Sequence, residues 1–258
     1  MKLRVAVYRL TSCSGCVLKL IDLLNRCPEF LERLEFVHFK ELGIVSESVD
    51  RVDVAIVEGA VTTPRDEELV KRVRRSSRIL VAVGTCAIAG GVAALRNWMS
   101  LEEAKRAVYP EPERIESLDR VRPVSETVSV DFEVPGCPVD EELLRYILMQ
   151  IVVGKRPSYH RESLCMECKR RGIPCVVVTK RIPCLGPIVS AGCGALCPSF
   201  GRGCYGCYGL KVDPRVDTLI KRFIEMGIDR SEIEGLIKRV LSWPKPVREV
   251  VERLGEGG

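Results

Sequence analysis

The sequence predicts an α/β protein in two parts: a mostly parallel sheet covered by helices, and then an irregular cysteine-rich segment with a helical tail. Three observations support this prediction. Apolar runs typical of buried strands alternate with helical patterns over residues 1–153. Eight of the 13 cysteines, with many Gly and Pro residues, fall between residues 157 and 209. Helical spacing returns over residues 212–254. We therefore expect two domains, 1–153 and 154–258.

The first part reads as strands and helices in alternation. Short runs rich in Val, Ile and Leu indicate strands over residues 3–10, 34–39, 53–57, 78–83 and 128–134. Between and after them, helical patterns cover residues 16–25, 63–76, 86–95 and 140–153. The second of these helices has the clearest start, because Thr63 can cap it, Pro64 suits its first position and Asp66 lies in its first turn. The β-α order predicts helices on both faces of the sheet.

The second part lacks a regular period until its tail. Residues 157–209 cannot bury enough apolar area to fold alone, and metal ligation can supply the missing folding energy. Within them, only residues 175–179 have the composition of a short strand. The tail predicts two or three helices, broken near Gly227 and at Pro244-Lys245-Pro246.

Composition and charge exclude several classes of protein. The longest apolar runs are far too short to span a bilayer, so no membrane span is expected. The first residues lack the features of a secretory signal, which favours a cytoplasmic location. The formal charge of +5 falls to about −1 if three cubane clusters of about −2 each are bound. Because aromatic residues are not interleaved with basic ones, we expect no nucleic-acid partner.

The first set of cysteines is dispersed along the predicted sheet. Cys13 and Cys16 form a C-x-x-C pair after the first strand, Cys86 follows the fourth strand, and Cys137 precedes the last helix. In an open α/β sheet the loops at the carboxyl ends of the strands converge on one edge. Thiolates there predict an iron–sulfur cluster, and the helix N-termini suit its negative charge. The alternatives are a thioredoxin-like redox pair, or buried thiols at Cys86 and Cys137.

Two further sets share the cysteine-rich segment. Two C-x-x-C pairs with four more cysteines are a strong metal signal in a chain without an export signal. The first set is Cys165, Cys168, Cys175 and Cys184, and the second is Cys193, Cys197, Cys204 and Cys207. Two Cys₄ zinc sites are the alternative, since zinc takes the same ligands. Iron is favoured because several one-electron centres in one chain make an electron-transfer path.

Four other residues are singled out. Cys27 closes a helix before Pro28 and is expected to be an ordinary buried thiol. His38 lies on a predicted strand and is expected to be structural, whereas His160 is a candidate ligand near the set that begins at Cys165. Glu58 follows the third strand, where it either lies near the first cluster or serves as a hydrogen-bonding structural residue.

At this point the motifs resemble a known family. Four stretches resemble the small subunit of nickel–iron hydrogenases and the related cluster-bearing subunit of complex I. They are Thr11-Ser12-Cys13-Ser14-Gly15-Cys16, Val57-Glu58-Gly59, Gly84-Thr85-Cys86-Ala87 and Pro135-Gly136-Cys137-Pro138. The stretches that look like the delta subunit of cytoplasmic sulfhydrogenases and NADP-linked hydrogenases are Cys184-Leu185-Gly186-Pro187, Ala191-Gly192-Cys193 and Gly203-Cys204-Tyr205-Gly206-Cys207.

The resemblance implies a flavodoxin-like first domain and three [4Fe-4S] clusters. The proximal cluster would use Cys13, Cys16, Cys86 and Cys137. The distal cluster would use Cys165, Cys168, Cys175 and Cys184, and the medial cluster Cys193, Cys197, Cys204 and Cys207. Cys165 stands where many exported members have histidine. Cys197 supplies a fourth medial ligand where many have none, which favours four-iron clusters at both sites.

The implied function is electron transfer within a hydrogenase. A partner large subunit would hold the nickel–iron centre, since this chain lacks the paired C-x-x-C motifs near both termini that such a subunit uses. Electrons would leave for an iron–sulfur or flavin diaphorase subunit that serves NADP, or for sulfur. The alternatives are a subunit of another redox complex, complex I-like or associated with heterodisulfide reductase, and a zinc-stabilised binding module.

Overall fold

The computed structural model describes residues 2–46, 50–158, 162–241 and 243–255. The chain divides into two compact units, a first unit (Met1–Ser158) and a second unit (Tyr159–Gly258). In the part of the chain that is described, no helix has the length and apolar character needed to cross a membrane.

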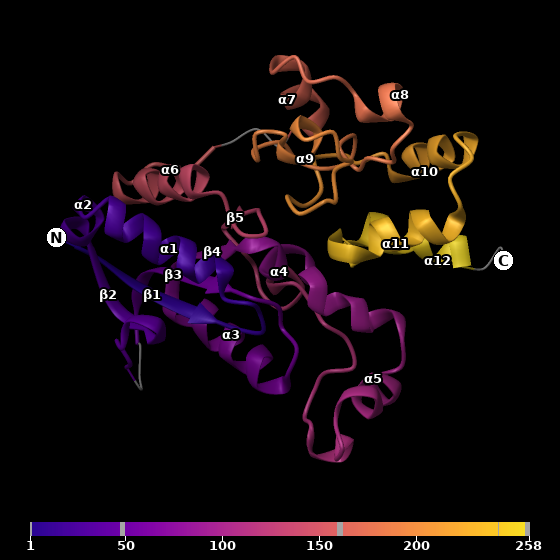
Figure 1. Ribbon diagram of the computed structural model, residues 1–258. Helices are drawn as coiled ribbons and strands as arrows, with labels where there is room; N and C mark the ends of the chain where they lie inside the picture. Colours follow the sequence, from indigo (N-terminus) through magenta and orange to yellow (C-terminus); the bar gives the residue numbers. More distant parts are fainter. Residues whose placement is uncertain (1, 47–49, 159–161, 242, 256–258) are drawn as a thin grey trace. The chain divides into compact units, whose positions relative to one another are not determined.

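The first unit is built on a five-stranded parallel sheet with the order β2-β1-β3-β4-β5 (Figure 1). This is the flavodoxin-like order, so the predicted fold class is confirmed. The strands are β1 (Leu3–Arg9), β2 (Leu34–Phe39), β3 (Val52–Glu58), β4 (Ser77–Val83) and β5 (Phe132–Val134). β5 is shorter than predicted, because the Asp131 carboxylate accepts the Leu80 amide in place of a ladder bond, at 2.8 Å.

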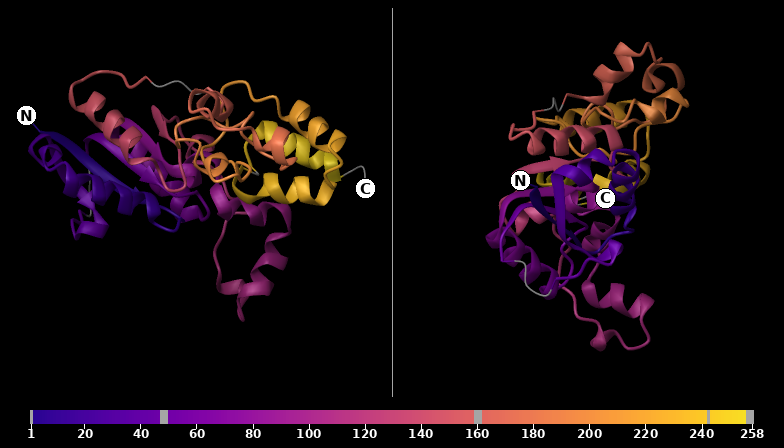
Figure 2. Two further views of the ribbon diagram at one scale, coloured as in Figure 1. Left: turned by 45° about the horizontal axis from the view of Figure 1, so that its top comes forward. Right: turned by 90° about the vertical axis from the view of Figure 1, so that its left-hand side faces the viewer.

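Helices cover both faces of this sheet, as predicted. On one face Val7, Ile56 and Val83 pack against α1 (Gly15–Arg26) and α6 (Glu141–Val152). The opposite face packs on α3 (Pro64–Ser76). The views in Figures 1 and 2 show α1 and α6 on the side of the sheet away from α3. Two further helices, α2 (Glu29–Arg33) and α5 (Leu101–Val108), were not predicted.

The start of α3 has the capping box expected from its sequence. The Thr63 hydroxyl accepts from the Asp66 amide at 3.1 Å, and the Asp66 carboxylate accepts from the Thr63 amide at 3.0 Å. These bonds satisfy amides that have no partner within the helix.

The predicted helix over residues 86–95 is interrupted. Helix α4 (Gly84–Ala89) ends at Gly90, and a 3₁₀ helix (Gly91–Trp98) follows. Gly90 and Gly91 both have positive φ angles, 78° and 56°, which glycine adopts without a steric penalty. This break holds the chain close to Cys86.

The second unit combines a cysteine-rich segment with helices. Its elements are α7 (Leu164–Arg170), α8 (Val176–Lys180), α9 (Leu196–Ser199), α10 (Val216–Glu225), α11 (Arg230–Leu241) and α12 (Lys245–Gly255). The last three confirm the predicted helical tail, and they lie side by side in Figures 1 and 2. Their buried faces include Phe223, Ile237 and Val247.

The prediction of a short strand over residues 175–179 is wrong. It forms α8, in which the Thr179 amide bonds the Cys175 carbonyl at 2.9 Å. The run of three valines has strand propensity, but propensity yields to context. Local helical bonds satisfy the backbone here.

Candidate metal centres

The four dispersed cysteines of the first unit come together at the carboxyl edge of the sheet. Cys13 lies in the loop after β1 and Cys16 in the first turn of α1. Cys86 lies in α4 directly after β4, and Cys137 in the loop between β5 and α6. The pKa of Cys16 is raised to about 12, mainly by burial, with smaller contributions from the charges of Glu58, Cys86 and Cys137. Cys13 and Cys137 act in the same direction on Cys86. The four thiols therefore lie within electrostatic reach of one another.

Glycines leave room beside these sulfurs. A Cβ at Gly84, which has a φ of +84°, would lie 2.4 Å from the Cys16 Sγ. A Cβ at Gly91 would lie 2.7 Å from the Cys86 Sγ. Any side chain at either position would fill the space next to a thiol. The site thus has a cradle that only glycine permits.

Backbone bonds tie the loops of this site together. The Val139 amide donates to the Cys16 Sγ at 3.4 Å, and the Thr85 amide donates to the Gly136 carbonyl at 2.9 Å. The second bond joins the first turn of α4, which carries Cys86, to the loop of Cys137. Such bonds fix the positions of the sulfurs and, where they reach sulfur, stabilise negative charge on it.

Glu58 ends β3 beside this site and is 2% exposed. The Ser12 hydroxyl donates to its carboxylate at 2.6 Å. Burial raises the pKa of Glu58, and its charge in turn raises the pKa of the Cys16, Cys86 and Cys137 thiols. Both readings of Glu58 from the sequence are therefore compatible with its position, near the thiols and hydrogen-bonded.

In the second unit, one group of thiols surrounds Gly186. A Cβ at Gly186 would lie 3.4 Å from the Cys184 Sγ and 3.5 Å from the Cys165 Sγ. The pKa of Cys165 is raised to about 11, mainly by burial, with smaller contributions from the charges of Cys184, Cys168 and Cys175. Cys175 is exposed, whereas Cys184 is buried.

The remaining thiols of the second unit are linked through Cys204. Burial raises the pKa of Cys204, and Cys184, Cys207 and Cys193 act in the same direction. Burial also raises the pKa of Cys193, and the charge of Cys197 acts in the same direction. The Cys204 amide donates to the Cys184 Sγ at 3.2 Å, so the two groups of thiols adjoin each other.

Sequence reasoning missed Glu167, which organises the loop around Cys193. Its two carboxylate oxygens accept from the amides of Gly192, at 3.0 Å, and Gly194, at 2.9 Å. The Arg171 guanidinium donates to the Gly194 carbonyl. The sequence held one signal, an acid within the C-x-x-C pair of Cys165 and Cys168, but nothing in it pointed to a loop so far along the chain.

Three of the other singled-out residues lie outside these groups of thiols or outside the described residues. Cys27 is only half-buried, at the end of α1, and its charged neighbours are Glu29, Arg145 and Glu141. His38 is buried and stacks on Tyr8, with ring centroids 4.8 Å apart, as expected for a structural residue. His160 lies outside the described residues.

The thiols fit an iron–sulfur cluster by their chemistry. Each group offers soft sulfur ligands, glycines beside sulfurs and backbone amides directed at them. Among the described residues, no three His, Cys, Asp or Glu side chains are arranged to hold a single metal ion. A cubane spreads its ligands over a larger body than one ion does, so this finding bears on mononuclear sites alone.

Comparisons with known proteins give the family. Residues 13–151 match the family described as NADH ubiquinone oxidoreductase, 20 Kd subunit. Sulfhydrogenase 2 subunit delta of Pyrococcus furiosus is 37% identical over 93% of this chain and 100% of its own length. A subunit of the vhu F420-non-reducing hydrogenase of Methanococcus voltae is 33% identical over 84% of this chain and 85% of its own length.

Solved structures agree with these relatives. A chain of an NAD⁺-reducing [NiFe]-hydrogenase in the H2-reduced state superposes with a TM-score of 0.56 and 31% identity, covering 62% of this chain and 96% of that one. The resemblance inferred from the motifs is thereby confirmed. This protein belongs to the family of the 20 Kd subunit of NADH ubiquinone oxidoreductase, together with hydrogenase subunits such as sulfhydrogenase delta.

Proposed function

We propose that this chain is the electron-transfer small subunit of a cytoplasmic [NiFe] hydrogenase. It would relay electrons between the nickel–iron site of a partner large subunit and a diaphorase-type or sulfur-reducing acceptor, through three [4Fe-4S] clusters. The observation that carries the proposal is the meeting of Cys13, Cys16, Cys86 and Cys137 at one edge of the sheet, in a cradle that glycines keep open. The relatives named as hydrogenase subunits support it.

The proximal cluster would be held by those four cysteines. Burial and the charges of neighbouring groups raise the pKa of the Cys16, Cys86 and Cys137 thiols, so a cationic metal core would be needed to hold them as thiolates. When bound, such a cluster supplies one-electron oxidation and reduction. The chain itself contributes the Val139 amide to sulfur and the buried surround that tunes the potential.

The distal and medial clusters would divide the remaining eight cysteines. The charge of Cys175 contributes to the raised pKa of Cys165, Cys168 and Cys184. This nearness supports its place in the distal set. The charge of Cys197 contributes to the raised pKa of Cys193, which supports the place of Cys197 in the medial set. It also contributes to the raised pKa of Cys184. The backbone bond from Cys204 to the Cys184 sulfur would bring the two sets into close succession.

The exposed edge of the proximal site supports docking of a large subunit. Cys13 and Cys137 are exposed in the chain by itself. Leu18 on α1 and Val92 beside α4 are also exposed, at 58% and 57%. A partner that covers these side chains would keep water away from the cluster, as a low-dielectric electron-transfer path requires.

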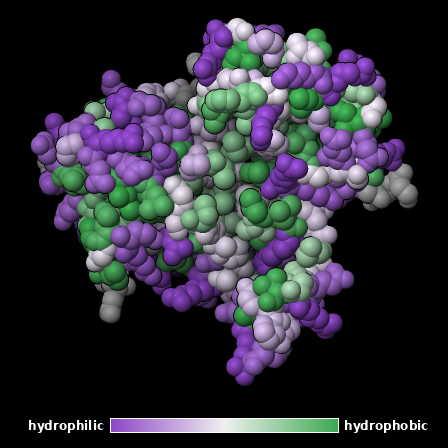
Figure 3. All heavy atoms as spheres, in the orientation of Figure 1, coloured by the Kyte–Doolittle hydropathy of each residue, from purple (hydrophilic) through white to green (hydrophobic). Residues whose placement is uncertain are grey.

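The cysteine-rich segment has features suited to an electron-accepting partner. Val178 on α8 and Phe200 beside α9 are 80% and 78% exposed, and green hydrophobic residues lie among purple ones over α7 to α9 in Figure 3. The described basic residues of the same segment are all exposed: Lys169, Arg170, Arg171, Lys180, Arg181 and Arg202. The segment's two carboxylates are already engaged, Glu162 with Arg170 and Glu167 with backbone amides. This surface favours an acidic iron–sulfur or flavin subunit.

Purification from native cells under anaerobic conditions tests the proposal. We expect a nickel-containing large subunit to copurify, and hydrogen to bleach the visible absorbance of this chain's clusters. A complex without nickel, whose chromophores are not reduced by hydrogen, would contradict the hydrogenase assignment and favour another redox complex.

A further inference from the structure

Helix α7 and residues 189–194 carry ligand candidates of different sets, yet they lie side by side. α7 holds the C-x-x-C pair of the proposed distal cluster, and residues 189–194 include the first cysteine of the proposed medial cluster. The Leu164 amide donates to the Val189 carbonyl at 2.9 Å, and the Ala191 amide donates to the Glu162 carbonyl at 2.9 Å. These bonds hold the two segments next to each other at the start of the helix.

The Glu167 carboxylate continues this contact. It stands within the C-x-x-C pair of α7, and its two oxygens accept from the amides of Gly192, at 3.0 Å, and Gly194, at 2.9 Å. Burial is the main cause of the raised pKa of the Cys168 and Cys193 thiols, and the charge of Glu167 adds to both. One carboxylate therefore lies within electrostatic reach of a ligand candidate from each set.

The amides of this loop face two different acceptors. Those of Ala195 and Leu196 donate to the Cys193 sulfur, whereas the two glycine amides are held by Glu167. Positive φ angles at Gly194 and Ala195, 67° and 49°, mark the turn between the two groups. Amides that donate to the sulfurs of a cluster stabilise the electron it gains and so raise its reduction potential. Glu167 engages two amides that could otherwise turn to sulfur, and it supplies negative charge in their place.

We propose that Glu167 lowers the reduction potentials of the medial and distal clusters together. The proposal rests on the proposed function, which assigns those two clusters. Reduction adds an electron to a cluster that is already anionic, and a fixed carboxylate beside its ligands makes that addition less favourable. The Arg170 guanidinium pairs with Glu162 rather than with Glu167. Because the same charge acts on both clusters, it keeps both potentials low without separating them.

Redox titration of the complete, cluster-loaded protein, followed by paramagnetic resonance, tests the proposal. The proximal and medial signals are identified by their loss in Cys13→Ser and Cys193→Ser. In Glu167→Gln the medial and distal clusters should both become easier to reduce. The reduction equilibrium constant of the medial cluster should rise about tenfold, which is about 59 mV for a one-electron couple. The proximal potential should stay where it is in the unchanged protein.

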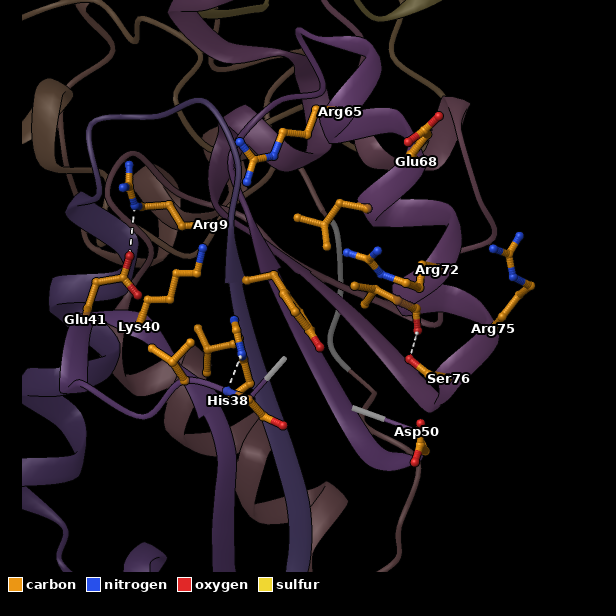
Figure 4. A pocket seen from close by; sticks show the side chains of 16 residues that line it. Arg9, His38, Lys40, Glu41, Asp50, Arg65, Glu68, Arg72, Arg75 and Ser76 are labelled. Carbon is orange, nitrogen blue, oxygen red and sulfur yellow. Dashed lines mark hydrogen bonds and ion pairs between the residues drawn. The ribbon is translucent and has the colours of Figure 1, made fainter. Parts of the chain in front are cut away.

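Two control variants separate this effect from the loss of any negative charge. Asp217→Asn removes a carboxylate from the helical tail of the same unit, where it pairs with Arg253. Glu41→Gln removes a carboxylate from the first unit, where it pairs with Arg9 at 2.9 Å (Figure 4). Both variants should leave the medial and distal potentials unchanged.

The outcomes separate this proposal from the proposed function. Unchanged or lower medial and distal potentials in Glu167→Gln would overturn the proposal, and a rise at one of the two clusters alone would overturn the shared control. If Glu167→Gln does not assemble its clusters, Glu167→Asp keeps the charge but reaches the amides less well. It should raise both potentials by a smaller amount, and no rise there would overturn the proposal too. Iron and sulfide content of the unchanged protein is read first, because a protein without these clusters refutes the proposed function itself.

Discussion

The substitution Gly84→Ala probes the cradle of the proximal site. Gly84 has a φ of +84°, and an added Cβ would lie 2.4 Å from the Cys16 Sγ, far inside ordinary contact distance. Gly43 is a matched control, with a φ of +75° and nothing within 4 Å of its Cβ position. Both substitutions incur the left-handed penalty, about 1–2 kcal/mol, but only the first adds an overlap with a thiol.

The two variants should therefore differ in magnitude and in kind. Overpacking in a confined site costs about 1–3 kcal/mol, so Gly84→Ala should lose about 2–5 kcal/mol in all. At about 2–4 °C per kcal/mol for a domain of this size, its Tm should fall by roughly 4–20 °C. Gly43→Ala should lower the Tm by roughly 2–8 °C.

Cluster content separates the steric effect from simple destabilisation. Iron analysis with paramagnetic resonance of the reduced protein should show the proximal signal missing or altered in Gly84→Ala and intact in Gly43→Ala. If Gly84→Ala keeps the unchanged signal and the stability of the Gly43→Ala control, the argument that glycine keeps this sulfur accessible is wrong.

Three other perturbations test separate parts of the account. Cys13→Ser should abolish hydrogen-dependent dye reduction while the two clusters of the second unit remain detectable by paramagnetic resonance; retained dye reduction would count against the proximal assignment. Glu167→Gln removes one charge-assisted acceptor from the loop of Cys193, so unfolding should become easier by about 1 kcal/mol and the medial signal should broaden, whereas an unchanged spectrum would remove Glu167 from the site. Burial lowers the pKa of His38, so the unfolded state binds its proton more readily and stability should fall as pH drops below about 6.5. Denaturant midpoints at pH 7.5 and 5 should differ more in the unchanged protein than in His38→Gln, and an equal difference would reject this origin.

Local signals in the sequence were enough for most of the sheet. The capping sequence at Thr63 and the apolar runs of the first four strands are decided by neighbours in the chain, and all were predicted. α8 was not, because its valines favour a strand when taken alone and form local helical bonds in the fold. The break at Gly90 was missed although the consecutive Gly90 and Gly91, which adopt positive φ angles, are a local signal for the end of a helix.

For the candidate sites too, features set by nearby residues could be predicted, and contacts between distant residues could not. Spacing indicated which cysteines are ligand candidates, because C-x-x-C pairs and strand-end positions are visible in the sequence. The contribution of Glu167 could not be seen, since its partners lie 25 and 27 residues away.

Metal content of the native protein tests the central claim most directly. Elemental analysis of the anaerobically purified chain should give about twelve irons and an equal amount of acid-labile sulfide, with little zinc, as three four-iron cubanes require. A colourless protein with stoichiometric zinc and little iron would contradict the account.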